Sequence, residues 1–200
     1  MPTALPLDLS ALLGAAAWAH LPAAVQRRFA AGHPAATYRG LMDMRCSPLG
    51  RVLAWLVTPL KSPLAAANAS GVPTTVRVSA VGAGVVWARH FDDGVGHVCS
   101  TKELDDNGRL QERTRGGLGM ALDVFEEGGA LVFQSRHYFL DIGRMRIAMP
   151  GWLSPGTCRV EHRDLGAGLF RFTLSMTHPI WGETFHQTGV FVDPSPSLAG

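Results

Sequence analysis

The strongest candidate for acid–base chemistry is Glu112, which follows Leu110 two residues later. Residues two apart on a β-strand share a face, so Glu112 points into an apolar interior if Leu110 does. A buried carboxylate needs a cationic partner such as Arg89, or its pKa rises until it can act as a general acid or base. Two interpretations follow: an Arg89–Glu112 ion pair that fixes strand register, or a catalytic Glu112.

Two tryptophans and a histidine are further candidates for contacting a ligand. Trp87 lies on an early strand and belongs either to the core or to a ligand-stacking surface. Trp152 stands between Pro150 and Pro155 in a loop, and loops carry function on rigid scaffolds. His178 ends an alternating strand, where its ring either caps the strand end or lines a pocket mouth. The predicted ligand-binding residues are Trp87, Arg89, Ser100, Glu112, Trp152 and His178.

Metal and cofactor motifs are missing from the sequence. The 8 histidines form no His-x-x-x-His pair. His97 and Cys99 share strand parity, but a zinc site needs three or four converging ligands and only two can be placed. There is no Gly-x-Gly-x-x-Gly motif, P-loop or Gly-x-Ser-x-Gly motif. The sequence therefore predicts no metal site and no cofactor.

These candidates depend on a chain that alternates between apolar and polar residues after residue 72. The clearest stretch is 170–176, where Phe170, Phe172, Leu174 and Met176 take one parity. Such alternation is typical of strands with one buried face. Asp-Asn-Gly and Gly-Gly sequences between the segments are typical of hairpin turns. The predicted strands are 74–81, 84–91, 96–104, 108–114, 118–126, 130–140, 143–148, 157–164, 168–177 and 182–192.

The first part of the chain indicates helices and irregular segments. Asp8 or Ser10 can cap a first helix through Trp18, and Pro22 can start a second. Apolar residues at 3- and 4-residue spacing after Pro48 predict an amphipathic helix that ends near residue 59. Residues 61–72 are expected to form a loop, and 149–156 a crossing loop or lid.

Together these elements predict a mainly β (α+β) fold. It would be a strongly curved antiparallel sheet or barrel-like fold with N-terminal helices closing one side. We expect a single domain over 1–193, with a helical part at 8–60, a β part at 73–193 and a flexible tail at 194–200.

Composition limits the classes of function. Of the 200 residues, 46% are hydrophobic and only 17% are charged, and the net charge is +2. Such a balance, without a Lys/Arg run, argues against nucleic acid as a partner. The 3 cysteines form no Cys-x-x-Cys pair, which favours a reducing compartment. No signal peptide or integral membrane segment is evident, so we predict a cytoplasmic protein.

Several spaced residues resemble those of domain-of-unknown-function family 4166. They are Leu21-Pro22-x-x-Val25, Trp87-x-Arg89-x-Phe91, Ser100, Glu112-Arg113, Pro150-x-Trp152-Leu153-x-Pro155, His178-Pro179 and Gly182. The resemblance runs from about residue 20 to 192 and implies one compact domain without an assigned activity. Members of that family often follow a saccharopine-dehydrogenase-like domain. Phe29 stands where a histidine is expected in many members.

Three functional hypotheses follow. The leading one is a binding module for a small hydrophobic or amphipathic molecule, held between sheet and helices. The alternative is an acid–base enzyme of isomerase, cyclase or lyase type that uses Glu112 on an apolar substrate. A third is a regulatory domain that docks on a dehydrogenase-like protein through its helices.

Overall fold

A computed structural model describes residues 7–31, 35–56, 58, 67–92 and 96–194. Burial alternates along most of the strands and gives them one polar and one apolar face, and a closed sheet can bury all the apolar faces together. The strands are β1 (Ala36–Cys46), β2 (Ala69–Val81), β3 (Gly84–Phe91), β4 (Gly96–Leu104), β5 (Leu110–Arg113), β6 (Leu118–Glu127), β7 (Ala130–Ile142), β8 (Met145–Ala148), β9 (Thr157–Gly166), β10 (Leu169–His178) and β11 (Gly182–Val192). No helix in these ranges is long and apolar enough to cross a membrane.

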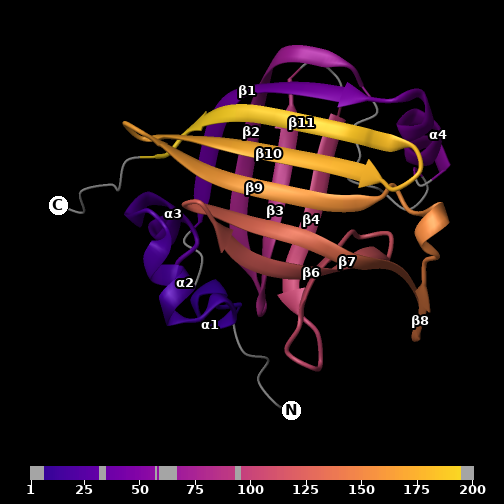
Figure 1. Cartoon of the computed structure of the whole chain (residues 1–200), viewed down its shortest axis with the longest axis horizontal. Coiled ribbons are helices and arrows are strands. Elements are labelled where there is room, and N and C mark those ends of the chain that lie inside the picture. The colour runs from indigo at the N-terminus through magenta and orange to yellow at the C-terminus, as the bar shows by residue number, and fades with distance from the viewer. Residues whose placement is uncertain (1–6, 32–34, 57, 59–66, 93–95, 195–200) are drawn as a thin grey trace.

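Across the described residues, 10 antiparallel strands close into a barrel, as the sequence predicted (Figure 1). The order is β6-β5-β4-β3-β2-β1-β11-β10-β9-β7, and pairing between β6 and β7 closes the ring. The short strand β8 pairs only with the last part of β7, from Phe139 to Ile142. Closure removes sheet edges and directs the apolar faces of all ten strands into one interior.

Strand β1 is the main departure from the sequence prediction, which placed no strand before residue 73. It lies between β2 and β11 and is required for closure of the barrel. Tyr38, Met42 and Met44 are buried on its inner face. Gly40 shares that parity, and a β-carbon there would lie 2.1 Å from the Val190 carbonyl oxygen. The glycine that permits close packing against β11 also weakens the alternating pattern by which a strand is recognised.

Three short helices precede the barrel: α1 (Leu9–Leu13), α2 (Ala15–His20) and α3 (Ala23–Arg28). Asp8 caps α1 by accepting hydrogen bonds from the backbone N–H groups of Ser10 and Ala11. The sequence predicted one helix through Trp18, but Gly14 divides it at φ +80°, a conformation that favours glycine. The predicted start at Pro22 is confirmed, because this residue is the N-cap of α3.

The end of α3 inserts a side chain into the barrel. Phe29 is almost fully buried, with ring centroids 5.8 Å from Trp87, 4.9 Å from His162 and 6.0 Å from Phe133. This residue replaces the expected histidine and supplies a purely apolar plug. The N-terminal helices thus close one side of the barrel, as predicted.

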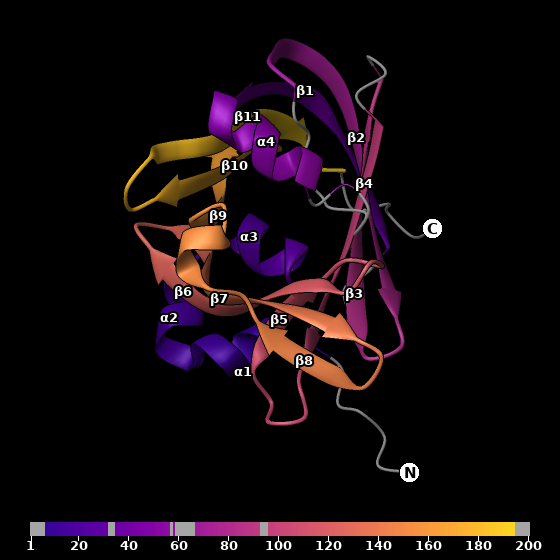
Figure 2. The ribbon, with the colours of Figure 1, turned by 90° about the vertical axis from the view of Figure 1, so that its right-hand side faces the viewer.

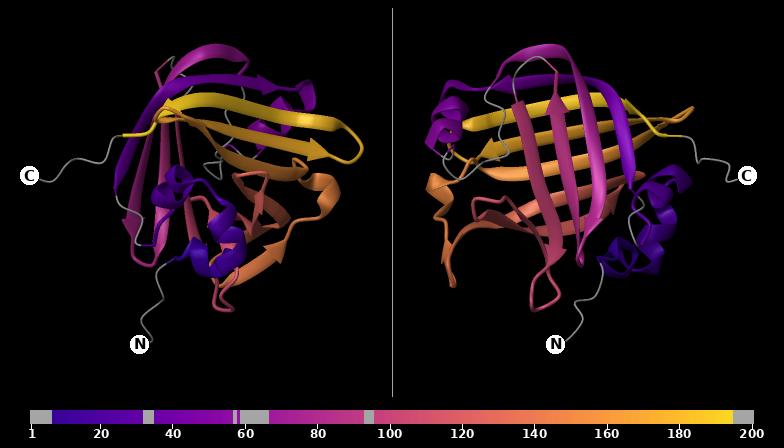
Figure 3. Two further views of the ribbon diagram at one scale, coloured as in Figure 1. Left: turned by 60° about the vertical axis from the view of Figure 1, so that its left-hand side comes forward. Right: turned by 180° about the vertical axis from the view of Figure 1, so that it is seen from behind.

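Helix α4 (Pro48–Leu56) lies at the other end of the barrel, which we call the mouth (Figures 2 and 3). It confirms the predicted amphipathic helix, with Leu53 and Ala54 buried. The strand ends nearest α4 lie at the mouth, and so does the segment 149–156. Helices α1–α3 lie at the opposite end of the barrel.

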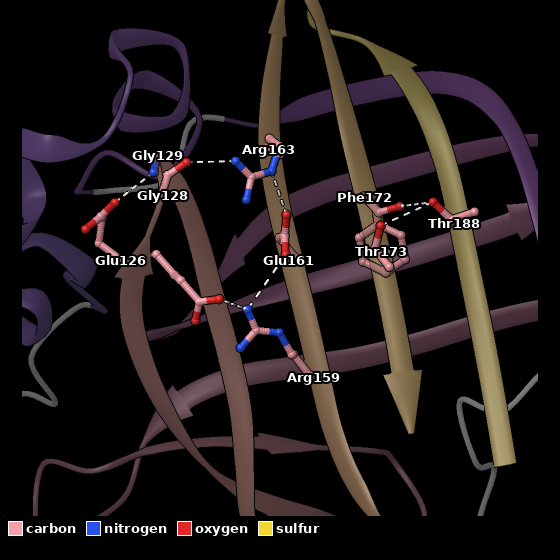
Figure 4. Close-up of polar contacts among 10 residues, drawn as sticks. Glu126, Gly128, Gly129, Arg159, Glu161, Arg163, Phe172, Thr173 and Thr188 are labelled. Carbon is pink, nitrogen blue, oxygen red and sulfur yellow. Dashed lines mark hydrogen bonds and ion pairs between the residues drawn. The ribbon is translucent and has the colours of Figure 1, made fainter. Parts of the chain in front are cut away.

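The outer wall beside β7 and β9 is polar and carries paired charges (Figure 4). The Arg163 guanidinium donates to Glu161 at 2.7 Å and to the Gly128 carbonyl at 2.7 Å. Arg159 donates to Glu127 at 2.9 Å. On the neighbouring strands, Thr173 and Thr188 lie within hydrogen-bond distance at 3.2 Å. These polar residues occupy the solvent-facing parity, opposite the apolar core.

Candidate functional site

A pocket of about 50 Å³ lies at the mouth of the barrel. Its walls come from α4, strands β4, β5, β6, β7 and β10, the β5–β6 turn and the segment 149–156. Its apolar lining is Leu53, Leu118, Gly119, Met120, Met149, Leu153, Pro155 and Met176, and its polar lining is Ser100, Glu112, Arg113, Thr114 and Tyr138. Such a lining, mostly apolar with a few polar groups, is typical of sites for small organic ligands.

The acidic residue of this pocket is part of a buried ion pair. Glu112 on β5 pairs in register with Lys102 on β4, and their charged groups lie 2.7 Å apart. Both side chains are about 7% exposed. The structure therefore corrects the predicted partner: the direct ion pair is formed with Lys102, and Arg89 contributes only longer-range attraction.

The ionisation of Glu112 is set by this surrounding charge. Burial would raise its pKa, but the charge of Lys102, the hydrogen bond from Lys102, the Ser100 hydroxyl and the charge of Arg89 outweigh burial and hold the pKa below its ordinary value. Glu112 is thus a carboxylate at neutral pH. An ionised carboxylate can accept about four hydrogen bonds, so it can take a donor from a ligand in addition to Lys102.

Deeper in the barrel, Trp87 and Arg89 lie beside a much smaller void of about 10 Å³. The guanidinium carbon of Arg89 lies 5.1 Å from the centre of the Phe172 ring. The Lys102 ammonium lies 5.6 Å from the centre of the Trp87 ring. A void of this size holds about one water molecule. Most of the interior is therefore filled by side chains, and of these two voids the mouth pocket is the larger.

His162 occupies the same aromatic interior. Its ring contacts those of Phe29, Trp87 and Phe172. Burial, together with the charges of Arg28, Lys102 and Arg89, holds its pKa well below the ordinary value, so the ring is neutral. Its Nδ1 atom is buried and has no hydrogen-bond partner among the described residues.

The segment 149–156, predicted as a crossing loop or lid, forms a short 3-10 helix η2 (Gly151–Leu153) and is fixed at both sides of the pocket. The Tyr138 hydroxyl donates to the Gly156 carbonyl at 2.9 Å. The Thr184 hydroxyl donates to the Pro155 carbonyl at 2.6 Å. Leu153 and Pro155 are held against the pocket by these bonds, which connect the segment to β7 and β11.

The predicted ligand-binding residues occupy four different environments. Ser100 and Glu112 line the pocket, whereas Trp87 and Arg89 belong to the packed interior. Trp152 projects from η2 with 67% of its surface exposed.

His178 is buried under Trp181, with ring centroids 4.1 Å apart. Its Nδ1 accepts a hydrogen bond from the backbone N–H of Ile180, so the ring caps the turn. It does not line the mouth pocket.

The residues that share parity on β4 distinguish the inner from the outer face. Val98, Ser100 and Lys102 are buried, whereas His97 is exposed and Cys99 is half-buried. His97 and Cys99 therefore lie on the outer parity. Among the described residues, no group of three His, Cys, Asp or Glu side chains is arranged to hold a metal ion.

Sequence analysis missed Lys102 and the methionines of the pocket. Lys102 shares strand parity with Ser100, and that parity was a usable signal once the inner face of β4 was known. Met120, Met149 and Met176 come from three distant segments, and only barrel closure brings them together. Methionine side chains are flexible, so this wall can adapt to ligands of different shape.

Comparison with known proteins identifies the family of the chain. The family model described as "Domain of unknown function (DUF4166)" matches residues 21–191. No curated protein and no solved structure matched the chain. The match covers most of the chain, from just before α3 to the penultimate residue of β11, and the chain therefore belongs to the DUF4166 family.

Proposed function

We propose that this domain binds a small amphipathic molecule whose polar end enters the mouth pocket. The observation that carries the proposal is an ion-paired carboxylate, Glu112, in the wall of a mostly apolar pocket. The β-barrel fold is consistent with a ligand-binding module. A hydroxyl or amine on the ligand would donate to Glu112, while its hydrocarbon part would contact the methionines and leucines.

The volume of the pocket limits what can enter it. An engineered cavity of about 150 Å³ holds benzene, so a space of about 50 Å³ admits a narrow group and excludes a ring unless side chains move. A linear chain with a terminal hydroxyl or amino group fits this limit. The rest of the ligand's hydrocarbon chain would extend between Leu53 and Leu153 toward the exposed residues of the mouth.

The charge of Glu112 distinguishes ligand classes. A carboxylate ligand would bring a second negative charge against an already ionised side chain, which is unfavourable in a buried site. A primary alcohol or amine of equal length would instead donate a hydrogen bond to a carboxylate oxygen of Glu112. We therefore expect a primary alcohol or amine to bind more tightly than the matched carboxylate.

The lowered pKa of Glu112 bears on the enzymatic alternative. A general acid must hold a proton near neutral pH, and efficient bases have a pKa near the working pH. Glu112 is held ionised by Lys102, which weakens it as an acid and makes it a poor base. These properties favour binding over proton transfer as the role of Glu112.

Binding is tested with a matched series: 1-decanol, decylamine and decanoate, measured by isothermal titration calorimetry and native mass spectrometry. We expect 1:1 binding of the alcohol and the amine and at least tenfold weaker binding of decanoate. Leu118→Trp fills the pocket edge and should abolish binding. Leu165→Trp, at the other end of the barrel, is the matched control and should bind normally. Equal binding by both variants, or no binding of any probe to the wild-type protein, would refute the proposal.

A further inference from the structure

Large apolar side chains are exposed around the mouth of the barrel. We call this set the mouth rim, and it consists of Trp55 and Leu56 on α4, Trp152 on η2, and Ile180 and Trp181 in the β10–β11 turn. Trp55, Trp152 and Ile180 are 73%, 67% and 74% exposed. Exposing so many large apolar residues at one end is unfavourable in water and commonly marks an interaction surface.

The three elements of the mouth rim are held together by one residue, Thr184. Its carbonyl oxygen accepts a hydrogen bond from the Ser47 N–H, directly before α4. Its hydroxyl donates to the Pro155 carbonyl, directly after η2. Thr184 itself is the third residue of β11, close to the turn that carries Ile180 and Trp181. In Figure 2, α4 and the segment that contains η2 accordingly flank the mouth on the same side of the molecule.

The charges near the mouth rim are mostly positive. Arg51 on α4, Arg115 in the β5–β6 turn and Arg144 in the β7–β8 turn are exposed and form no ion pair with another described residue. Two of the nearby acidic residues are already paired with arginines. Asp141 binds Arg113 at 3.0 Å and Arg146 at 2.8 Å, and Glu183 lies 3.7 Å from Arg45.

From these observations we infer that the mouth rim docks on an anionic lipid bilayer surface. Tryptophan rings are favoured at the boundary between hydrocarbon and headgroups, because one edge is polar and the rest is apolar. Arginines around such an apolar patch attract anionic headgroups. Each of the three elements presents its apolar tip outward, so the rim can enter the headgroup layer while the paired charges of the outer wall remain in water (Figure 4).

Docking in this orientation would place the mouth pocket against the lipid. Leu53 and Leu153 line the pocket, and each lies within two residues of a rim tryptophan, Trp55 or Trp152. The docking surface uses different side chains from the polar lining of the pocket. Vesicle binding is therefore expected to persist in the pocket variant Leu118→Trp, so a failure of the proposed ligand site and a failure of docking are separable.

The test is co-sedimentation of the full chain with vesicles of phosphatidylcholine alone or mixed with an equal amount of phosphatidylglycerol. We expect binding to the anionic vesicles, a blue shift of tryptophan emission, and weaker binding as salt is raised. The double variant Trp55→Ser/Trp152→Ser should weaken partitioning by roughly tenfold or more, because each side chain loses apolar burial. Arg51→Glu should weaken it by roughly fivefold or more, since each basic residue near an anionic surface contributes about that factor.

Matched controls use exposed residues away from the mouth. Val81→Ser, at the β2–β3 turn near α1, and Arg77→Glu, on the outer face of β2, should leave partitioning unchanged. Circular dichroism melts confirm that each variant is folded. Absence of binding to anionic vesicles at low salt, or equal loss in the control variants, would overturn the inference. A dimer in light scattering that the double tryptophan variant abolishes would also overturn it, because the rim would then serve a second copy of this chain.

Discussion

The Lys102 ammonium and the Glu112 carboxylate lie 2.7 Å apart on adjacent strands, inside a barrel that is otherwise mostly apolar. Each group alone would be costly to bury, and each compensates the charge of the other. The pair also separates two regions of the interior. Glu112 faces the mouth pocket, whereas the Lys102 ammonium lies 5.3 Å from the centre of the Phe133 ring, in the packed interior.

Removing either member of this pair should destabilise the protein strongly. Lys102→Met or Glu112→Leu leaves one buried charge without its partner, and we expect a loss of about 3–5 kcal/mol in the free energy of unfolding. The double variant Lys102→Met/Glu112→Leu should recover part of that loss, since neither member of the pair is left alone, although buried Arg89 still loses the attraction of Glu112. Urea denaturation of the four proteins measures the coupling, and additive losses in the double variant would contradict the pairing.

His162 should make stability depend on pH between about 6.5 and 5. Its pKa is well below the ordinary value in the folded state, so as pH falls only the unfolded chain takes up this proton. The free energy of unfolding should therefore fall by about 1.4 kcal/mol per pH unit from this group alone, and the contribution is complete at higher pH. His162→Phe should remove that slope, whereas the exposed-site control His97→Asn should retain it. Urea titrations across this range provide the comparison, and identical slopes in wild type and His162→Phe would argue against a neutral buried histidine.

Phe29 should be among the most sensitive positions of the N-terminal segment. Phe29→Ala removes the ring that packs on Trp87, Phe133 and His162, and such truncations cost about 3–5 kcal/mol. Leu12 is only partly buried, so Leu12→Ala in α1 should cost much less. Thermal and urea unfolding of both variants test whether α3 plugs the barrel. A small loss for Phe29→Ala would show that it does not.

The β-carbon of an alanine at residue 156 should not fit. Gly156 has φ +99°, and an added β-carbon would lie 2.3 Å from the Thr177 backbone. Gly156→Ala is therefore expected to destabilise the fold by roughly 1–3 kcal/mol or more and to displace Pro155 from the pocket. Gly151→Ala, in the same segment, has open space and is the matched control. Unfolding by urea and binding of 1-decanol would both report the difference, and equal behaviour of the two variants would contradict the close approach.

Much of the architecture could be predicted from periodicity. Alternation along 170–176 predicts a strand with the inner face that β10 has, and the same rule places Glu112 inside with Leu110. Asp8 and Pro22 identify helix starts because capping and fixed φ are local properties. Strand β1 was missed because Gly40, which is required by close packing against β11, weakens the local pattern.

Pairings between distant residues depended on the closed barrel. Nothing local in the sequence distinguishes Arg89 from Lys102 as the partner of Glu112. Arg89 on β3 and Lys102 on β4 both occupy positions that point into the barrel. The β4–β5 register decides it by placing Lys102 directly opposite Glu112. In the same way Leu53, Met120, Met149 and Met176 form one pocket wall only after β6 and β7 pair to close the ring. Side-chain periodicity is encoded within a few residues, so the sequence by itself determined a curved sheet with an apolar inner face. Contacts between segments far apart in the chain depend on register and closure, so only the tertiary structure decided which groups meet at the mouth.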